Sequence, residues 1–278
     1  MGERATWTRA RLGDGGPRLD LLTARFEKHV YAPHAHDEFT IGVCAPDSAS
    51  VIAYRGGHIR TGPGAIVVLA PGETHTGGPG NTTASYAYRA VYAEPGLLTE
   101  GTLGGVPHFR EPLIDDPELS AALSREYAEL SAHPDPLRTE STVPWLLTAL
   151  ARRHSTARPT DDRVPGAAAL AGTVRDRLAD ELLAPPPLST LAADLGLSRY
   201  QLLRAFRTTM GLPPYAWLAQ HRVHRARGLL DAGVRPAEAA ALVGFADQAH
   251  LTRWFRRVLG VTPAAYRNSV QDDRWGRS

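Results

Sequence analysis

The chain has 278 residues, with 31 Lys and Arg against 29 Asp and Glu, so its formal net charge is only +2. Hydrophobic residues make up 43% of the chain, enough for a buried core, and no apolar run approaches the ~20 residues that a spanning helix needs. The charged N-terminus excludes a secretory signal, and the single cysteine, Cys44, excludes an internal disulfide. We therefore expect a cytoplasmic protein of two domains with no membrane partner.

The charge is divided unevenly between the two halves. Residues 1–162 hold 15 basic and 20 acidic side chains, a balance of −5, whereas residues 163–278 hold 16 and 9, a balance of +7. All basic residues but Lys28 are Arg, which suits bidentate hydrogen bonding to phosphates and guanine edges. A GC-rich genome also favours Arg codons, and this alternative stays open for the Arg excess. Because codon bias does not sort charge by half, the asymmetry predicts an anionic partner for the second half.

The first half is predicted to form an all-β barrel or sandwich followed by helices. From residue 19 to 94, short runs such as LDLLTARF, FTIGVCA and AIVVLA alternate with turns rich in Gly, Pro, Asn and Asp. From Pro117 the apolar period becomes helical, which predicts helices over 117–131 and 138–154, with Pro144 as a break or late start in the second. We expect these helices to form an appendage that covers the barrel.

A polar, Pro-bearing segment separates this part from an all-helical remainder. The segment STARPTDDRVPG, residues 155–166, has no apolar periodicity and is the best candidate for a linker. The sequence therefore predicts an α+β protein with a β domain over 1–154, a linker over 155–166 and an all-α domain over 167–278.

An internal repeat lies in the basic half. Gly196 pairs with Gly244 at an offset of 48, and from Leu202 and Leu251 onward the Leu, Arg, Phe, Gly and Pro positions match at an offset of 49. Each copy has a short Ala-rich helix, a Gly turn, a polar N-cap at Ser198 or Asp247, and a second helix, which is the order of a helix-turn-helix. Two hairpins with merely solvated outer faces are the alternative, which the matched Arg positions disfavour.

The span from Leu188 to Arg267 resembles the DNA-binding domain of the AraC/XylS family of transcription regulators. The resemblance rests on the motif Arg222-Val223-x-x-Ala226-x-x-Leu229-Leu230, the Gly244-Phe245 turn, the stretch Leu251-Thr252-Arg253-x-Phe255-Arg256 and the closing Gly260-Val261-Thr262-Pro263-x-x-Tyr266-Arg267. It implies two helix-turn-helix units, joined by a linker helix, that enter the major groove of double-stranded DNA. The residues it places on DNA are Arg199, Tyr200, Leu203, Arg204 and Arg207 in the first copy, and Gln248, Ala249, His250, Thr252, Arg253 and Arg256 in the second.

The β domain carries a histidine motif, Pro33-His34-Ala35-His36-Asp37-Glu38, and a later Pro71-Gly72-Glu73-Thr74-His75. If residues 34–38 are extended, His34, His36 and Glu38 share one face, and His75 across the barrel would complete a set of potential ligands. These segments resemble the two cupin motifs, although Glu38 comes earlier than the glutamate of metal-binding cupins. Two interpretations stay open: His34, His36 and His75 bind a divalent metal, or they only line a pocket. The predicted effector pocket is lined by His34, His36, Glu38, Tyr54, His75 and Tyr88.

Two functions follow, from different classes. The first is a ligand-responsive, DNA-binding transcriptional regulator and no enzyme, which senses an unknown small molecule in a cupin-like N-terminal barrel. The resemblance also implies a homodimer, and contact with RNA polymerase if the protein is an activator. The second is a metal-dependent cupin enzyme with a helical accessory domain. The double repeat favours the regulator, and the sequence shows no nucleophile motif or Gly-rich phosphate loop for catalysis.

Overall fold

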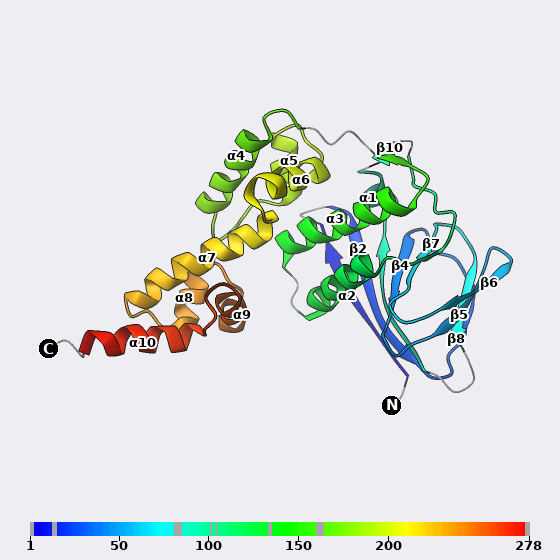
Figure 1. The fold of residues 1–278 in the computed structure, drawn as a ribbon, viewed down its shortest axis with the longest axis horizontal. Coiled ribbons are helices and arrows are strands. Elements are labelled where there is room, and N and C mark those ends of the chain that lie inside the picture. Colours follow the sequence, from blue (N-terminus) through cyan, green and yellow to red (C-terminus); the bar gives the residue numbers. More distant parts are fainter. Residues whose placement is uncertain are drawn as a thin grey trace. The chain divides into compact units, whose positions relative to one another are not determined.

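The computed structural model describes residues 3–12, 16–80, 85–100, 102–103, 105–132, 135–159 and 164–275. The chain divides into two compact units: unit 1 comprises 1–163 together with 187–201, and unit 2 comprises 164–186 together with 202–278. Strands dominate the N-terminal part and helices follow it, as Figure 1 shows, so the predicted α+β class is confirmed. The described residues include no helix that is long and apolar enough to span a membrane.

Unit 1 is built on two antiparallel sheets. The larger has the order β1 (Arg4–Arg11), β2 (Arg18–Phe26), β9 (Tyr86–Ala93), β4 (Phe39–Cys44), β7 (Ile66–Leu69) and β11 (Leu113–Ile114). The smaller has the order β3 (Tyr31–His34), β8 (His75–Pro79), β5 (Ser50–Tyr54) and β6 (Gly57–Thr61). A short pair, β10 (Thr102–Leu103) and β12 (Arg158–Pro159), shows that part of the predicted linker is a strand.

Helices α2 (Pro117–Ala132) and α3 (Pro136–His154) cover part of the larger sheet, as Figure 1 shows. Leu119, Leu123 and Tyr127 face the sheet because their four-residue spacing puts them on one stripe of α2. The prediction that Pro144 breaks or starts the second helix is wrong, because α3 continues through it. The buried residues Val143 and Leu147 on either side of Pro144 join the same core, and this packing offsets the hydrogen bond that proline removes.

Unit 1 also holds two shorter helices, α1 (Gly96–Thr99) and α5 (Leu188–Asp194). Unit 2 contains α4 (Ala167–Asp180), α7 (Pro214–Asp231), α8 (Pro236–Leu242), α9 (Gln248–Leu259) and α10 (Pro263–Trp275). The repeat's other long helix, α6 (Arg199–Met210), begins in unit 1 and continues in unit 2.

The second helix-turn-helix has a core of its own in unit 2. Leu251 and Phe255 of α9 are fully buried with Val223 of α7 and Ala239 of α8. The side chain of Asp247 caps α9 by accepting a hydrogen bond from the His250 backbone N–H at 2.6 Å. Packing therefore fixes one face of α9 and leaves its opposite face to solvent.

Candidate functional site

A cavity of about 80 Å³ lies inside unit 1, where residues of both sheets line it. Three His, four Tyr and several small or apolar residues form its wall. Among the lining residues are Tyr31, His34, His36, Gly42, His75, Tyr86, Tyr88, Ala90 and Tyr92. Such a wall, mostly apolar with a few convergent polar groups, is typical of small-molecule sites.

The three histidines predicted from the sequence meet at this cavity. His34 and His75 are opposite partners in the β3–β8 ladder, and His36 follows two residues after His34. The rings of His34 and His75 lie 4.4 Å apart, centre to centre, and one nitrogen from each of the three rings lies within 4.8 Å of the others. Burial, and then the nearby His75 and His34, lower the pKa of His36 to about 4. Burial also lowers the pKa of His75.

Backbone carbonyls fix the tautomers of two of these rings. His34 Nδ1 lies 2.8 Å from the Ala32 carbonyl oxygen, and His75 Nδ1 lies 3.1 Å from that of Glu73. A carbonyl oxygen only accepts hydrogen bonds, so Nδ1 is the protonated nitrogen in both rings. In the neutral ring, Nε2 then carries the lone pair.

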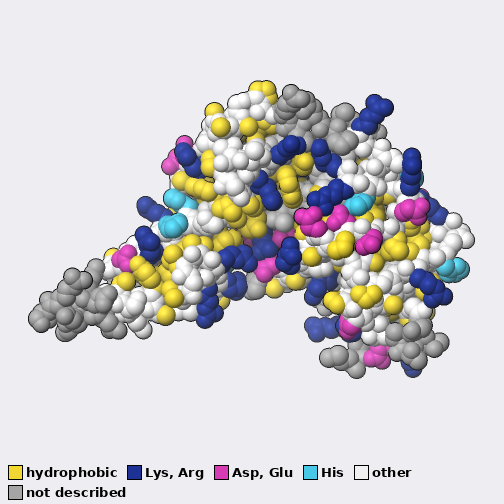
Figure 2. Space-filling model, in the orientation of Figure 1, with side chains coloured by type: hydrophobic (Ala, Val, Ile, Leu, Met, Phe, Trp, Pro, Cys, Tyr) yellow, Lys and Arg dark blue, Asp and Glu magenta, His cyan; other side chains and the backbone are white. Residues whose placement is uncertain are grey.

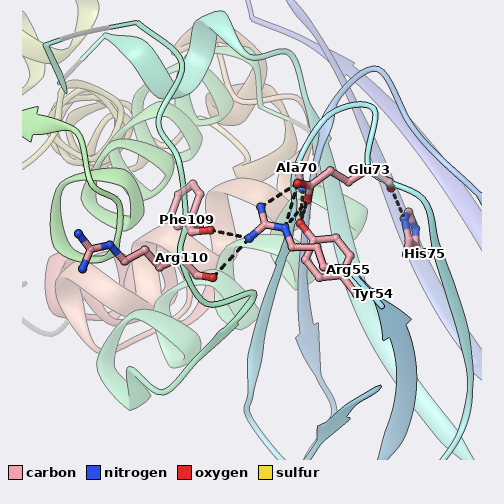
Figure 3. Close-up of polar contacts among 7 residues, drawn as sticks. All are labelled: Tyr54, Arg55, Ala70, Glu73, His75, Phe109 and Arg110. Atoms are coloured by element: carbon pink, nitrogen blue, oxygen red, sulfur yellow. Dashed lines mark hydrogen bonds and ion pairs between the residues drawn. The ribbon is translucent and has the colours of Figure 1, made fainter. Parts of the chain in front are cut away.

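A polar network holds the turn that carries His75, as Figure 3 shows. The Glu73 carboxylate accepts hydrogen bonds from the Tyr54 hydroxyl and from Arg55, whose Nη2 lies 2.8 Å from Oε1. Arg55 Nη1 also donates to the carbonyl of Phe109 at 3.3 Å. The Glu73 carbonyl that fixes His75 is therefore anchored to two neighbouring segments of the chain.

Two residues of the predicted effector pocket do not line the cavity. The chain bends at Asp37 and Glu38, which ends the two-residue alternation, and Glu38 lines a separate surface hollow with Asp20 and Glu94. The Tyr54 hydroxyl donates a hydrogen bond to the Glu73 carboxylate, and the Tyr54 ring packs with Val67 and Leu69. Assignment of Glu38 and Tyr54 to the pocket is therefore wrong for this structure.

The structure adds tyrosines to the pocket. Tyr31 and Tyr92 line the cavity beside Tyr88, and the hydroxyls of Tyr31 and Tyr88 are 3.0 Å apart. The alternation of Tyr86, Tyr88 and Tyr92 along β9 could have identified Tyr92, because residues two apart in a strand share a face. Tyr31 carries no such signal, because β3 pairs irregularly with β8 between Tyr31 and His34.

The second copy presents its predicted DNA-contacting residues on the outer face of α9. Gln248, Ala249, Thr252, Arg253 and Arg256 line a shallow hollow on this surface. Gln248, Arg253 and Arg256 are exposed. Figure 2, in the orientation of Figure 1, shows Lys and Arg side chains in dark blue on the surface at the position of α9. His250 also belongs to the predicted set, but it is half-buried with its ring 5.0 Å from that of Phe245.

The predicted DNA-contacting residues of the first copy are more buried than those of the second. Within unit 1, Arg199 Nε donates to Glu100 Oε1 at 2.9 Å, and the Tyr200 ring stacks on Trp145 with centres 5.4 Å apart. Leu203 is fully buried, so the prediction that it faces the groove is wrong; burial of this leucine is the favourable outcome in water. Arg204 is half-buried and Arg207 is exposed.

Comparisons with known proteins find relatives of both the N-terminal β-rich part and the C-terminal helical part. Residues 191–269 match a helix-turn-helix domain family, and residues 16–147 match the AraC-like ligand binding domain family. An uncharacterized HTH-type transcriptional regulator of Bacillus subtilis, YbfI, is 28% identical over 84% of this chain and 87% of its own length. The arabinose operon regulatory protein of Escherichia coli is 25% identical over 80% of this chain and 78% of its own.

Among solved structures, fatty acid-bound ToxT from Vibrio cholerae is similar over 90% of this chain and 94% of its own, with 12% identity and a TM-score of 0.35. The named relatives are transcriptional regulators, and the alternative prediction of a metal-dependent enzyme finds no support among them.

Proposed function

Because the chain belongs to the AraC family of ligand-responsive transcriptional regulators, with a helix-turn-helix DNA-binding domain and an N-terminal ligand-binding domain, we propose which residues perform each task. The outer face of α9 reads base edges in the major groove of double-stranded DNA. The cavity with His34, His36, His75 and Tyr88 binds the effector. The exposed, concave surface of α9 is the observation that carries the DNA-reading part.

The chemistry of α9 suits a groove-reading helix. The N-terminal residues of a recognition helix contact base edges, where Arg pairs with guanine and Gln with adenine. Gln248 and Arg253 are side chains of this kind in the first part of the exposed face, and Ala249 and Thr252 offer methyl contacts to thymine. Arg256 lies one turn later on the same face, where a phosphate contact is expected.

In the first copy we propose that Arg204 contacts a base and Arg207 a phosphate. Arg199 and Tyr200 already have partners in Glu100 and Trp145, so their proposed DNA contacts require these partners to separate. The present arrangement therefore supports DNA contact by α9 more strongly than by α6.

An effector acts on DNA binding only through a difference in its affinity for two arrangements of the protein. The cavity suits such a ligand because six strands contribute to its wall, so an occupant contacts both sheets of unit 1 at once. We propose that occupancy of the cavity changes the affinity of the chain for its operator.

Three further points follow from the family alone. We propose that the protein works as a homodimer, that it acts in the cytoplasm, and that it contacts RNA polymerase if it activates transcription. Sedimentation of the full chain with and without operator DNA tests the first of these: a monomer under both conditions contradicts it.

Selection from random duplexes tests the proposed function. The full chain is incubated with a random duplex library, bound DNA is amplified over several rounds, and the enriched site is measured against a scrambled duplex of equal composition. We expect the selected site to bind about 10³-fold or more tightly than the scrambled one at physiological salt. Equal affinity for both duplexes contradicts sequence-specific reading.

A further inference from the structure

We propose that a groove beside α2, on the face of the larger sheet that α2 and α3 cover in part, binds an organic anion with two linked phosphate groups. This arginine groove has a volume of about 1140 Å³, and its basic lining residues are Arg4, Arg25, Arg89 and Arg125. Of its lining residues, only Cys44 and Tyr88 also line the histidine cavity, so the groove is a second site, additional to the proposed effector cavity.

The arginine groove begins where the apolar surface of the sheet ends. Leu21 of β2 pairs with Val91 of β9, and both belong to the core that includes residues of α2 and α3. Two residues along each strand, and therefore on the same face, Thr23 pairs with Arg89, and both line the groove. One face of the sheet thus changes within two residues from a buried apolar surface to an open polar one.

The strand register brings three of the arginines together. Arg4 of β1 is directly opposite Arg25 of β2. Arg89 of β9 is a diagonal neighbour of Arg25, because Arg25 pairs with Ala87. Like charges directly opposite in a sheet are destabilising, so the arrangement costs stability when no anion is bound. Arg125 of α2 adds a fourth arginine from the side of the groove.

These arginines have few carboxylates around them. Among the residues that line the groove, Asp115 is the only acidic one. Arg25 is paired with Asp47 at 3.1 Å, whereas the other three arginines are exposed and form no ion pair with any carboxylate that the structure describes. Residues 1–162 together carry a balance of −5, so the groove is cationic within an acidic part of the chain. A local concentration of positive charge in a hollow attracts anions.

The chemistry and the spacing of the arginines select a diphosphate. A guanidinium binds phosphate oxygens in bidentate geometry. Arg4 and Arg89 lie two strands and two residues apart, which places their Cα atoms about 12 Å from each other. Two linked phosphates span this distance between the side chains better than one does. Thr6 and Thr23 lie between the two arginines, and their hydroxyls add hydrogen-bond donors for phosphate oxygens.

The rest of the wall provides for an organic group on the phosphates. Val43 and Ile114 are apolar lining residues, and Leu113 beside them is 37% exposed. The volume of the groove is comparable with the roughly 300–1,000 Å³ of small-molecule sites, which suits a ligand of nucleotide size. A second copy of the chain is a poorer occupant, because two cationic faces repel each other.

Pyrophosphate binding tests the phosphate site. The full chain is titrated with inorganic pyrophosphate by calorimetry, in a chelator and at constant ionic strength. Arg89→Gln should weaken binding at least about tenfold, because a charge-assisted contact to phosphate is lost. Arg110→Gln, at an exposed position of the same unit outside the groove, is the matched control and should bind as the parent chain does. If the parent binds no pyrophosphate, or Arg89→Gln binds it as tightly as the parent, the site is overturned.

Thermal unfolding without anion checks the fold of the variant. Arg89→Gln should unfold at the same temperature as the parent or a higher one, because it removes a like-charged neighbour of Arg25. A clearly lower unfolding temperature would show that Arg89 has a structural role and would contradict the proposal.

A pair of substitutions in α2 tests the electrostatics with every arginine in place. Ala121 is exposed, lines the groove and lies four residues before Arg125. The carboxylate of Ala121→Glu should pair with Arg125 and repel the anion, so this variant should bind pyrophosphate several-fold more weakly. Ala121→Gln has the same shape without the charge and should bind as the parent does. Equal binding by the two variants overturns the assignment of the anion to this groove.

ADP, AMP and methyl diphosphate then test the ligand class. ADP should bind more tightly than AMP, because it has the second phosphate, and more tightly than methyl diphosphate, because it has the larger organic group. If AMP binds as tightly as ADP, the requirement for two phosphates is overturned. If methyl diphosphate does so, the apolar contact is overturned.

DNA and α9 are the other places where an anion effect could arise. Binding of Arg89→Gln to the selected duplex should equal that of the parent, and Arg256→Ala should keep its affinity for pyrophosphate. A loss of duplex affinity in Arg89→Gln as large as its loss of pyrophosphate affinity would show that the groove contacts DNA. A loss of pyrophosphate affinity in Arg256→Ala would place the anion on α9. Either result overturns the proposal and leaves sequence-specific DNA reading intact.

Discussion

The guanidinium of Arg222 in α7 donates two hydrogen bonds to the carbonyl oxygen of Leu182, from Nη2 at 2.6 Å and from Nε at 3.1 Å. Leu182 follows the end of α4, where carbonyls lack partners within the helix. Arg222 is only 7% exposed, and its guanidinium also lies over the Phe245 ring. These contacts therefore tie α4 to the turn of the second helix-turn-helix within unit 2.

Gly244 is predicted to be required for this arrangement. A Cβ at this position would lie 2.9 Å from both Arg222 Nη2 and the Leu182 oxygen, and its φ of +85° already disfavours any side chain. Gly260→Ala is the matched control, since Gly260 has a φ of +78° but nothing within 4 Å of its Cβ. We expect a loss of about 1–2 kcal/mol of unfolding free energy for Gly260→Ala and a larger loss for Gly244→Ala, measured by urea unfolding. Equal losses contradict the close approach.

A buried ion pair joins α2 and α3 and leads to a second prediction. Arg138 Nη2 lies 2.9 Å from Glu126 Oε2, and Glu126 is only 3% exposed. Burial raises the pKa of Glu126, while Arg138 acts to lower it. Arg138→Met should cost about 3–5 kcal/mol at pH 7, because it leaves a buried carboxylate without its partner. The exposed neighbour Arg125, replaced by Met, is the control and should cost little.

The pH dependence separates this cause from lost packing. In Arg138→Met the pKa of Glu126 in the folded state lies above its unfolded value. Stability is therefore greatest at acid pH, where the carboxyl is protonated, and falls as the pH rises through the folded-state pKa. Adding Glu126→Gln to the variant should restore most of the loss at pH 7. A loss that is independent of pH and is not restored by Glu126→Gln would show that Arg138 acts through packing alone.

Asp116, at the start of α2, carries the third prediction. Burial acts to raise its pKa, but hydrogen bonds from His154, the Leu119 backbone N–H and Arg153 outweigh it and lower the pKa to about 2. A lowered pKa stabilises the fold above the unfolded value of 3.8, and this contribution is lost as the pH falls toward 2.

Asp116→Asn should therefore lower the unfolding temperature at pH 7 and reduce its dependence on pH between 4 and about 2. Asp115→Asn, at the exposed neighbouring position, is the control. Thermal unfolding followed by circular dichroism over this range measures both. If the two variants have the same pH profile, the hydrogen bonds of Asp116 do not contribute as the structure indicates.

The histidine cavity shows which part of a site the sequence can predict. His34, His36 and His75 were identified by residue type and strand period, and the structure brings them together. Glu38 does not join them, because the two-residue period holds only while the strand continues and the chain bends one residue before Glu38. Tyr31 is not predictable from the sequence, because its position depends on how β3 pairs with β8, and no local sequence pattern determines that pairing.

The helices show how far apolar spacing in the sequence predicts which residues are buried. The apolar stripe of Leu251 and Phe255 on α9 was predicted from spacing and is buried in the structure. The same spacing in α6 places Leu203 beside the stripe of Leu202 and Phe206, yet all three are buried. Periodicity gives the centre of the buried face, whereas its width depends on the neighbours that pack against it.

The last prediction separates base reading from phosphate contact on α9. Arg253→Ala should weaken binding to the selected duplex by about 1–3 kcal/mol and binding to a scrambled duplex much less, because a bidentate pair with guanine is lost. Arg256→Ala should weaken both alike and reduce the slope of log affinity against log salt by about 1, because one phosphate contact is lost. Arg235→Ala, exposed at the N-cap of α8, is the control of equal charge change. Fluorescence anisotropy over a salt series measures all three; if Arg253→Ala costs both duplexes equally, Arg253 does not read a base.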